Sequence, residues 1–114
     1  MAFSMVEKKA IESLLAAYCE GRVPPAVRDR VRMSFRIKGE SVTLLESRPS
    51  FVKRTEWIEM AIAQFRRDQN TGDWRLYCAD RNSKWHLYEP VRPKRTLRPL
   101  LAEVDRDPTG IFWG

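Results

Sequence analysis

The sequence holds little of what most catalytic and metal sites are built from. It has a single histidine, His86, and two cysteines, Cys19 and Cys78, that stand far apart and form no C-x-x-C pair. A structural zinc ion needs four ligands, mostly cysteine and histidine, so such a site is excluded. In a reducing compartment we expect both cysteines to be free, buried thiols. We therefore expect no metal and no other cofactor.

Other familiar signatures are missing as well. The chain has no P-loop, G-x-G-x-x-G, nucleophile elbow or H-E-x-x-H motif, so nothing supports nucleotide hydrolysis, dinucleotide redox chemistry or zinc hydrolysis. No apolar run approaches the ~18 residues of a membrane span, and the N-terminus lacks the layout of a signal peptide. The sequence therefore predicts a soluble cytoplasmic protein with no membrane partner. It predicts one domain over residues 1–114 and leaves the oligomeric state open.

Positive charge is present in excess and is concentrated in two stretches. The net charge is +6. Residues 28–38 carry five basic side chains and one acid, and residues 75–98 carry seven basic side chains and two acids. The remaining stretches are neutral or slightly acidic. Clustering of this kind is typical of proteins with a polyanion partner.

Alternation and capping signals predict an α+β fold. Ser4 and Glu7 have the spacing of a capping box and begin a helix over about 5–20. Residues 30–38 alternate apolar and polar, and with the turn at Gly39 and Glu40 they predict a hairpin over 30–47. Segment 55–67 fits helix and strand, and we favour strand because two turn-and-strand units follow it. With a helix capped by Thr96, the order is N-terminal helix, antiparallel meander of about five strands, and C-terminal helix, both helices on the apolar sheet face.

Two stretches carry a resemblance to a known family. They are W-R-L-Y…D-R-N-S-K-W-H-L-Y at 74–88 and L-L-A-E-V-D-R-D-P-T-G-I-F-W-G at 100–114. Both resemble a small bacterial family of domains of unknown function, over roughly residues 28–114, and the ending D-x-D-P-x-G-x-F-W-G is the most specific part. The resemblance implies the meander sheet and a bacterial origin. It implies no activity, ligand or catalytic residue.

Strand alternation in 74–88 predicts a basic sheet surface. Trp74, Leu76, Cys78, Trp85 and Leu87 are expected to point into the core. The opposite face is expected to present the candidate nucleic-acid-binding residues Arg75, Tyr77, Lys84, His86 and Tyr88, with Arg32 and Arg36 from the first hairpin. Single-stranded nucleic acid needs such rings for base stacking and cations for phosphates. The alternative is an ordinary solvated sheet face, where tyrosine and arginine pair across strands anyway.

Three further interpretations stay open. A metal-independent, RNase-like toxin would use His86 or Tyr88 to move the proton of the 2′-hydroxyl, with nearby cations stabilising the phosphorane. A protein-interaction domain would use an exposed I-F-W-G tail, whereas we expect Ile111, Phe112 and Trp113 to fold back onto the core. The acids at 103, 105 and 107 suit a helix end and an Asp-Pro turn better than a Mg²⁺ site. Our main hypothesis is a non-enzymatic binding module with nucleic acid as its partner and a protein partner as the alternative.

Overall fold

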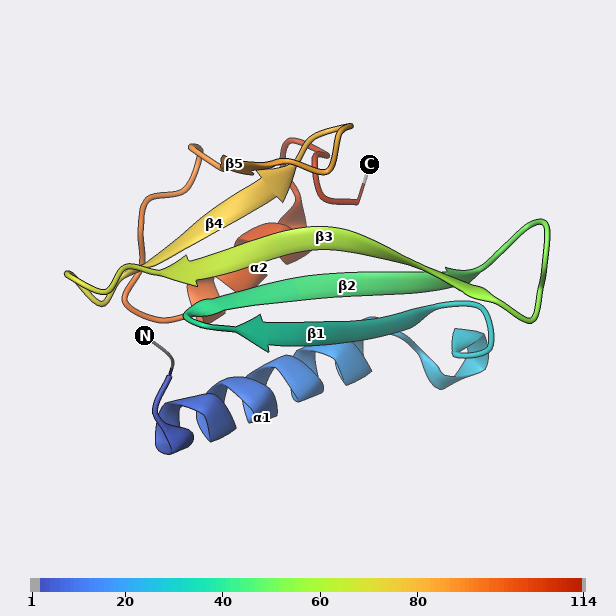
Figure 1. Cartoon of the computed structure of the whole chain (residues 1–114), viewed down its shortest axis with the longest axis horizontal. Helices are drawn as coiled ribbons and strands as arrows, with labels where there is room; N and C mark the ends of the chain where they lie inside the picture. Colours follow the sequence, from blue (N-terminus) through green and yellow to red (C-terminus); the bar gives the residue numbers. More distant parts are fainter. Residues whose placement is uncertain (1–2, 114) are drawn as a thin grey trace.

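Two helices and a five-stranded antiparallel sheet make up the computed structural model (Figure 1), which describes residues 3–113. Met1, Ala2 and Gly114, the last residue of the terminal motif, lie outside the described residues. The elements are α1 (Met5–Arg22), a short 3-10 helix η1 (Pro25–Val27), β1 (Arg32–Lys38), β2 (Ser41–Pro49), β3 (Trp57–Arg67), β4 (Trp74–Ala79), β5 (Trp85–Leu87) and α2 (Arg98–Arg106). The predicted α+β order of helix, five-stranded meander and helix is confirmed.

Helix α1 begins where its sequence predicts. The hydroxyl of Ser4 accepts a hydrogen bond from the backbone N–H of Glu7, and the Glu7 carboxylate accepts one from the N–H of Ser4. This reciprocal pair satisfies two of the backbone donors that a helix start leaves unpaired. The helix runs two residues past the expected end. Its side chains at 11, 15 and 19, four residues apart, are buried.

The strands follow one another in the order β1-β2-β3-β4-β5, each antiparallel to its neighbour. Lys38 pairs with Ser41 across a two-residue turn, and Gly39 has the positive φ of 59° that such turns require. The interpretation of 55–67 as a strand is confirmed by β3. A register shift between Leu44 and Leu45 gives β3 one extra residue, Ile62, at a bulge.

Both helices contribute buried side chains to one apolar cluster, together with one face of the sheet, which we call the inner face. The largest fully buried side chains are Leu15, Val42, Leu44, Phe65, Leu76, Leu100 and Val104. Helix α2 starts later than predicted, because Leu97 occupies the N-cap position and no side chain caps it. The predicted cap by Thr96 is therefore wrong, whereas Pro99 lies in the first turn as expected.

The C-terminal residues fold back onto the core. The Asp107 carboxylate accepts hydrogen bonds from the N–H groups of Phe112 and Trp113, at 3.1 and 2.9 Å. The indole N–H of Trp113 donates to the carbonyl of Val104 at 2.9 Å. Phe112 is buried and Trp113 packs against the core, as expected, whereas Ile111 is half exposed. These contacts give the D-x-D-P-x-G-x-F-W ending a structural role.

Candidate nucleic-acid interface

The residues of β5 point to the faces opposite to those predicted, and this rearranges the candidate site. Tyr77 pairs with Leu87. Residues directly opposite in an antiparallel pair share a face, so Trp85 and Leu87 lie beside Tyr77 on the face away from the helices. His86 and Tyr88 lie on the inner side. The prediction that Trp85 and Leu87 point into the core while His86 and Tyr88 point away is wrong.

The cause is the length of the connection between the two strands. Residues 80–84 form one loop, in which the Asp80 carboxylate accepts hydrogen bonds from the N–H groups of Asn82 and Lys84 at 2.8 and 3.0 Å. Ser83 has a positive φ of 61° inside this loop. Strand β5 therefore starts only at Trp85. Lys84, predicted to lie on the strand, belongs to the loop and not to the sheet face.

Tyr88 is buried under α2 and is closed to a ligand. Its side chain is 3% exposed, and its hydroxyl donates to the Glu103 carboxylate at 3.0 Å. Glu103 is itself buried and accepts a second hydrogen bond from Arg106 at 2.5 Å. Burial raises the pKa of Tyr88, which keeps the hydroxyl protonated as a donor. The predicted place of Tyr88 on an open face is therefore wrong, and its role is to anchor α2.

His86 lies at the rim of the sheet beside a carboxylate that the sequence interpretation missed. Its Nε2 atom is 2.6 Å from the Asp80 carboxylate, and its side chain is 60% exposed. The hydrogen bond with His86 is the main cause that lowers the pKa of Asp80. The loop contacts described above involve the same carboxylate. The pair therefore holds the 80–84 loop closed, and a catalytic role for His86 stays a prediction.

Four predicted residues do lie together on the side of the sheet away from the helices, which we call the outer face. They are Arg32, Arg36, Arg75 and Tyr77. The register adds residues that the sequence interpretation did not select as ligand contacts. The outer face thus carries the cations Arg32, Arg36, Lys38, Arg66 and Arg75 and the aromatic residues Trp57, Tyr77 and Trp85. Both helices pack against the inner face, so within residues 3–113 no helix covers the outer face (Figure 1).

The cations of the outer face are ordered by the strand register. Lys38 pairs with Ser41, Ser41 with Arg66, and Arg66 with Arg75. Neighbouring strands are about 4.8 Å apart, so these side chains form a row across four strands. The next row on the same face runs through Arg36, Thr43, Gln64 and Tyr77. The sheet therefore presents a cationic row beside a row that contains an aromatic ring.

Two of these cations are neutralised within the protein. Arg36 forms an ion pair with Glu59 at 2.9 Å, and Arg75 forms one with Asp68 at 2.9 Å. Backbone N–H groups and Arg75 together lower the pKa of Asp68, which therefore stays ionised. Both ion pairs are partly exposed, so each contributes little to stability.

The other three cations have no carboxylate partner among the described residues. The guanidinium group of Arg32 lies 3.7 Å from the ring centre of Trp57, and that of Arg66 lies 4.0 Å from the ring centre of Tyr77. Lys38 forms no ion pair within residues 3–113. Arginine stacked on an aromatic ring is held in place without losing its charge. These cations are therefore available for an external anion.

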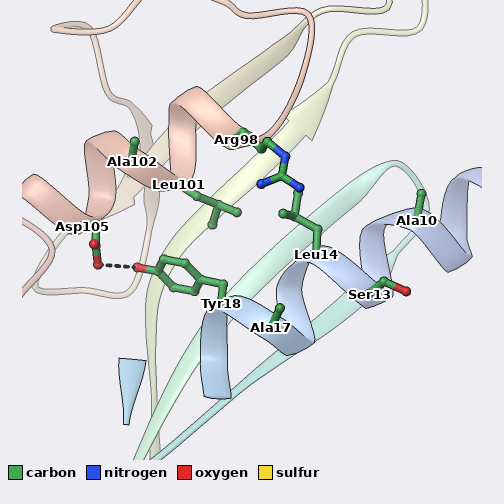
Figure 2. A pocket seen from close by; sticks show the side chains of 9 residues that line it. All are labelled: Ala10, Ser13, Leu14, Ala17, Tyr18, Arg98, Leu101, Ala102 and Asp105. Carbon is green, nitrogen blue, oxygen red and sulfur yellow. Dashed lines mark hydrogen bonds between the residues drawn. The ribbon is translucent and has the colours of Figure 1, made fainter. Parts of the chain in front are cut away.

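The groove between the two helices is the main concave alternative (Figure 2). It encloses about 550 Å³ and is lined largely by small and apolar side chains of α1 and α2. At one end the Tyr18 hydroxyl donates to Asp105 at 3.3 Å, and Arg22 donates to the same carboxylate at 2.8 Å. Burial and the neighbouring carboxylate raise the pKa of Tyr18. These groups tie the two helices together.

The described residues also hold no reactive thiol or metal cluster. Cys19 and Cys78 are free and buried, as expected, and burial raises the pKa of Cys19 to about 11. A buried, protonated thiol is a poor nucleophile. No group of three or more His, Cys, Asp or Glu side chains within residues 3–113 is placed to hold a metal ion. No helix in the same range is long and apolar enough to cross a bilayer.

Comparison with known proteins identifies a family but no characterised relative. The model of a domain of unknown function, DUF3024, matches residues 3–114. The match includes α1, which lies outside residues 28–114, the stretch that carries the sequence resemblance. No curated protein and no solved structure matches the chain. Because the family model covers almost the whole sequence, the chain belongs to the DUF3024 family of domains of unknown function.

Proposed function

We propose that this protein is a non-enzymatic module that binds single-stranded nucleic acid on the outer face of its sheet. The observation that supports this most is the row of Lys38, Arg66 and Arg75, two of which have no acidic partner among the described residues, beside the half-buried ring of Tyr77. Glu59 is the one acidic side chain on the outer face of the described strands, and it is already paired with Arg36. A polyanion therefore meets little repulsion there.

The chemistry of the outer face matches both the phosphates and the bases of a single-stranded nucleic acid. Cations bind successive phosphates with little regard to sequence, and they release counterions as they do so. Trp57, Tyr77 and Trp85 come from three different strands, and their half-buried rings offer part of their surface to unpaired bases. Stacking of a base on such a ring contributes about 1–3 kcal/mol. Two free, buried thiols suit a reducing compartment, so we place this activity in the cytoplasm.

Binding is tested by fluorescence anisotropy with labelled single-stranded RNA and DNA of the same sequence, titrated over a range of salt. We expect binding that weakens as salt rises. A triple variant, Arg32→Gln, Lys38→Gln and Arg66→Gln, removes the three unpaired cations and is expected to reduce the salt slope by about 2, at about 0.7 per lost phosphate contact. No binding of the unmodified protein at ~50 mM salt would refute the proposal, because phosphate contacts strengthen as salt falls.

A matched control separates the outer face from net charge alone. Lys8→Gln, Lys9→Gln and Arg98→Gln remove the same charge from exposed positions on the two helices. We expect this variant to keep the affinity and the salt slope of the unmodified protein. An equal loss in both variants would mean that the outer face has no special role.

RNA cleavage is a second candidate, favoured only by the exposed His86 imidazole beside Asp80. The experiment is incubation of labelled RNA with the protein and with His86→Ala, in the presence of a metal chelator. Cleavage that His86→Ala abolishes would support an enzyme. Intact RNA would leave binding alone as the function.

A further inference from the structure

Half of β3 has an edge without a neighbouring strand. β3 pairs with β2 along nearly its whole length but with β4 only over residues 64–67. Among the described residues, 57–63 therefore have no strand partner on the β4 side. Figure 1 shows this half of β3 extending past β4 toward the loop that joins it to β2. An open edge presents a row of backbone N–H and C=O groups to any strand that can pair with them.

The side chains beside this edge are apolar and exposed. Of the eight large apolar side chains most exposed within residues 3–113, four belong to β3 and the loop before it: Phe51, Val52, Ile58 and Met60. Ile58 and Met60 point to the inner side, where they are 52% and 57% exposed. A groove of about 400 Å³ lies next to Met60 and is also lined by Ile62 and Trp113. Exposed apolar surface of this kind marks an interaction site.

The edge of β1 and the far edge of β4 are protected. The outer-face side chains of β1 include three cations, Arg32, Arg36 and Lys38, and charged side chains on an edge strand discourage pairing. The far edge of β4 is occupied by β5 and, at Trp74, by a two-way backbone hydrogen bond with Lys94. The open half of β3 carries one charge, on Glu59, which is neutralised by Arg36. It is thus the edge best suited to accept a strand.

We propose that a second copy of this chain pairs with this edge. The two β3 strands would run antiparallel about a two-fold axis perpendicular to the sheet, which joins the two five-stranded sheets into one. Such a self-complementary interface is the usual way in which identical chains assemble. This axis leaves both outer faces on the same side. If those faces bind nucleic acid as proposed above, the dimer has a nucleic-acid-binding surface twice as long as that of one chain.

Charge and strand geometry select one register for this pairing. Directly opposed residues share a face, so the two-fold axis passes through a residue and not between two residues. Only an axis at Met60, the middle residue of 57–63, pairs the whole open segment with its copy. An axis at Glu59 would oppose two carboxylates, which is unfavourable. An axis at Met60 opposes Met60 and the partner's Met60, and it sets Ile58 against the partner's Ile62. The apolar inner side chains then cover one another.

Sedimentation of the full chain, without nucleic acid and over a range of concentrations, tests the dimer. We expect a mass twice that of the 13.4 kDa chain. Ile58→Lys with Met60→Lys should halve the observed mass while circular dichroism stays native, because inward-pointing charges block edge pairing. The control, Met5→Lys with Val6→Lys, changes two apolar residues on α1 that are even more exposed, and it should remain dimeric. A monomeric unmodified protein, or a dimer that survives both lysines, would overturn the proposal.

Oxidative cross-linking tests the register. Met60→Cys places a thiol beside its copy at the axis, so mild oxidation should convert most of the protein into a covalent dimer. Glu59→Cys faces the partner's Ala61 in this register and should form little or none. The native thiols at 19 and 78 are buried and should not interfere. Cross-linking through position 59 and not through position 60 would overturn the register, and because neither assay contains nucleic acid, both outcomes are independent of the proposed function.

Discussion

The inner and outer faces of the sheet are built from the same five strands but contain different chemistry. On the inner face, Leu44, Phe65 and Leu76 are fully buried under the helices. On the outer face, cations lie on aromatic rings, as Arg66 does on Tyr77, and no described helix covers them. Strand register decides the face on which each residue lies. It thereby separates the side chains that stabilise the fold from those available to a ligand.

The largest expected effect comes from neighbouring residues of β4 that point to opposite faces. Leu76→Ala removes a fully buried side chain and should cost about 2–5 kcal/mol of unfolding free energy. Tyr77→Ala should cost less, since it loses mainly partial packing and a cation–π contact with Arg66 that contributes about 0.5–1 kcal/mol. Urea unfolding followed by circular dichroism measures both.

Nucleic-acid affinity should show the reverse order in these two variants. At a temperature where both are folded, Tyr77→Ala should weaken binding by about 1–3 kcal/mol, and Leu76→Ala should bind like the unmodified protein. If Tyr77→Ala destabilised the fold as much as Leu76→Ala, the outer ring would be part of the core and the division between faces would fail.

A smaller effect is expected from Tyr88 and His86, two residues apart. Tyr88→Phe removes the hydroxyl that donates to buried Glu103 and should cost about 1–3 kcal/mol. His86→Ala breaks an exposed pair with Asp80 and should cost at most about 1 kcal/mol. Thermal unfolding compares the two. A larger loss in His86→Ala would mean that the 80–84 loop, and not the anchor of α2, holds β5 in place.

The first hairpin was predictable because its short turn fixes the register of the two strands. Gly39 and Glu40 form a two-residue turn, and only one side of the alternating strand before it is apolar. A slip by one residue would expose that whole apolar side, so the pattern and the turn select the same register. The outward placement of Arg32 and Arg36 followed from this.

The last hairpin was not predictable in the same way. Both alternations of W-H-L-Y contain a large aromatic residue, so hydrophobicity alone does not decide which side is buried. Contacts outside the strand determine which side is buried. The Asp80 carboxylate closes a five-residue loop, and Glu103 of α2 accepts a hydrogen bond from the hydroxyl of Tyr88. These partners are distant in sequence or depend on loop geometry. The sequence interpretation therefore placed the wrong pair of residues outside.

Strand β3 shows a second limit. Its sequence fits helix and strand alike, so the pattern did not predict on which face of the sheet Arg66 and Trp57 lie. The bulge at Ile62 changes the alternation within the strand, which separates the outer positions before it from those after it. The short overlap with β4, which leaves the edge open, is a property of strand pairing that no local pattern encodes.

The smallest effect we predict concerns the ionic link between the helix layer and the sheet. Arg67, at the end of β3, binds Glu7 in the first turn of α1 and Glu40 in the β1–β2 turn. The hydrogen bond from Arg67 is the main cause that lowers the pKa of Glu7 from 4.5 to about 2. A carboxyl whose pKa is lower in the folded state stabilises the fold above its ordinary pKa, and this contribution is lost as pH falls.

The unmodified protein should therefore lose stability as pH falls from 4.5 to about 2, and Glu7→Gln should show a flatter dependence in that window. Glutamine keeps an acceptor for the Ser4 N–H, so the capping box survives and only the charge is lost. Glu12→Gln, on the same helix and without an ion pair among the described residues, is the matched control and should keep the full slope. Thermal midpoints measured across this range compare the three proteins. Identical slopes in all three would show that the link between Glu7 and Arg67 contributes nothing to stability. Apolar packing and the Tyr88–Glu103 contact would then be the interactions that join the helices to the inner face.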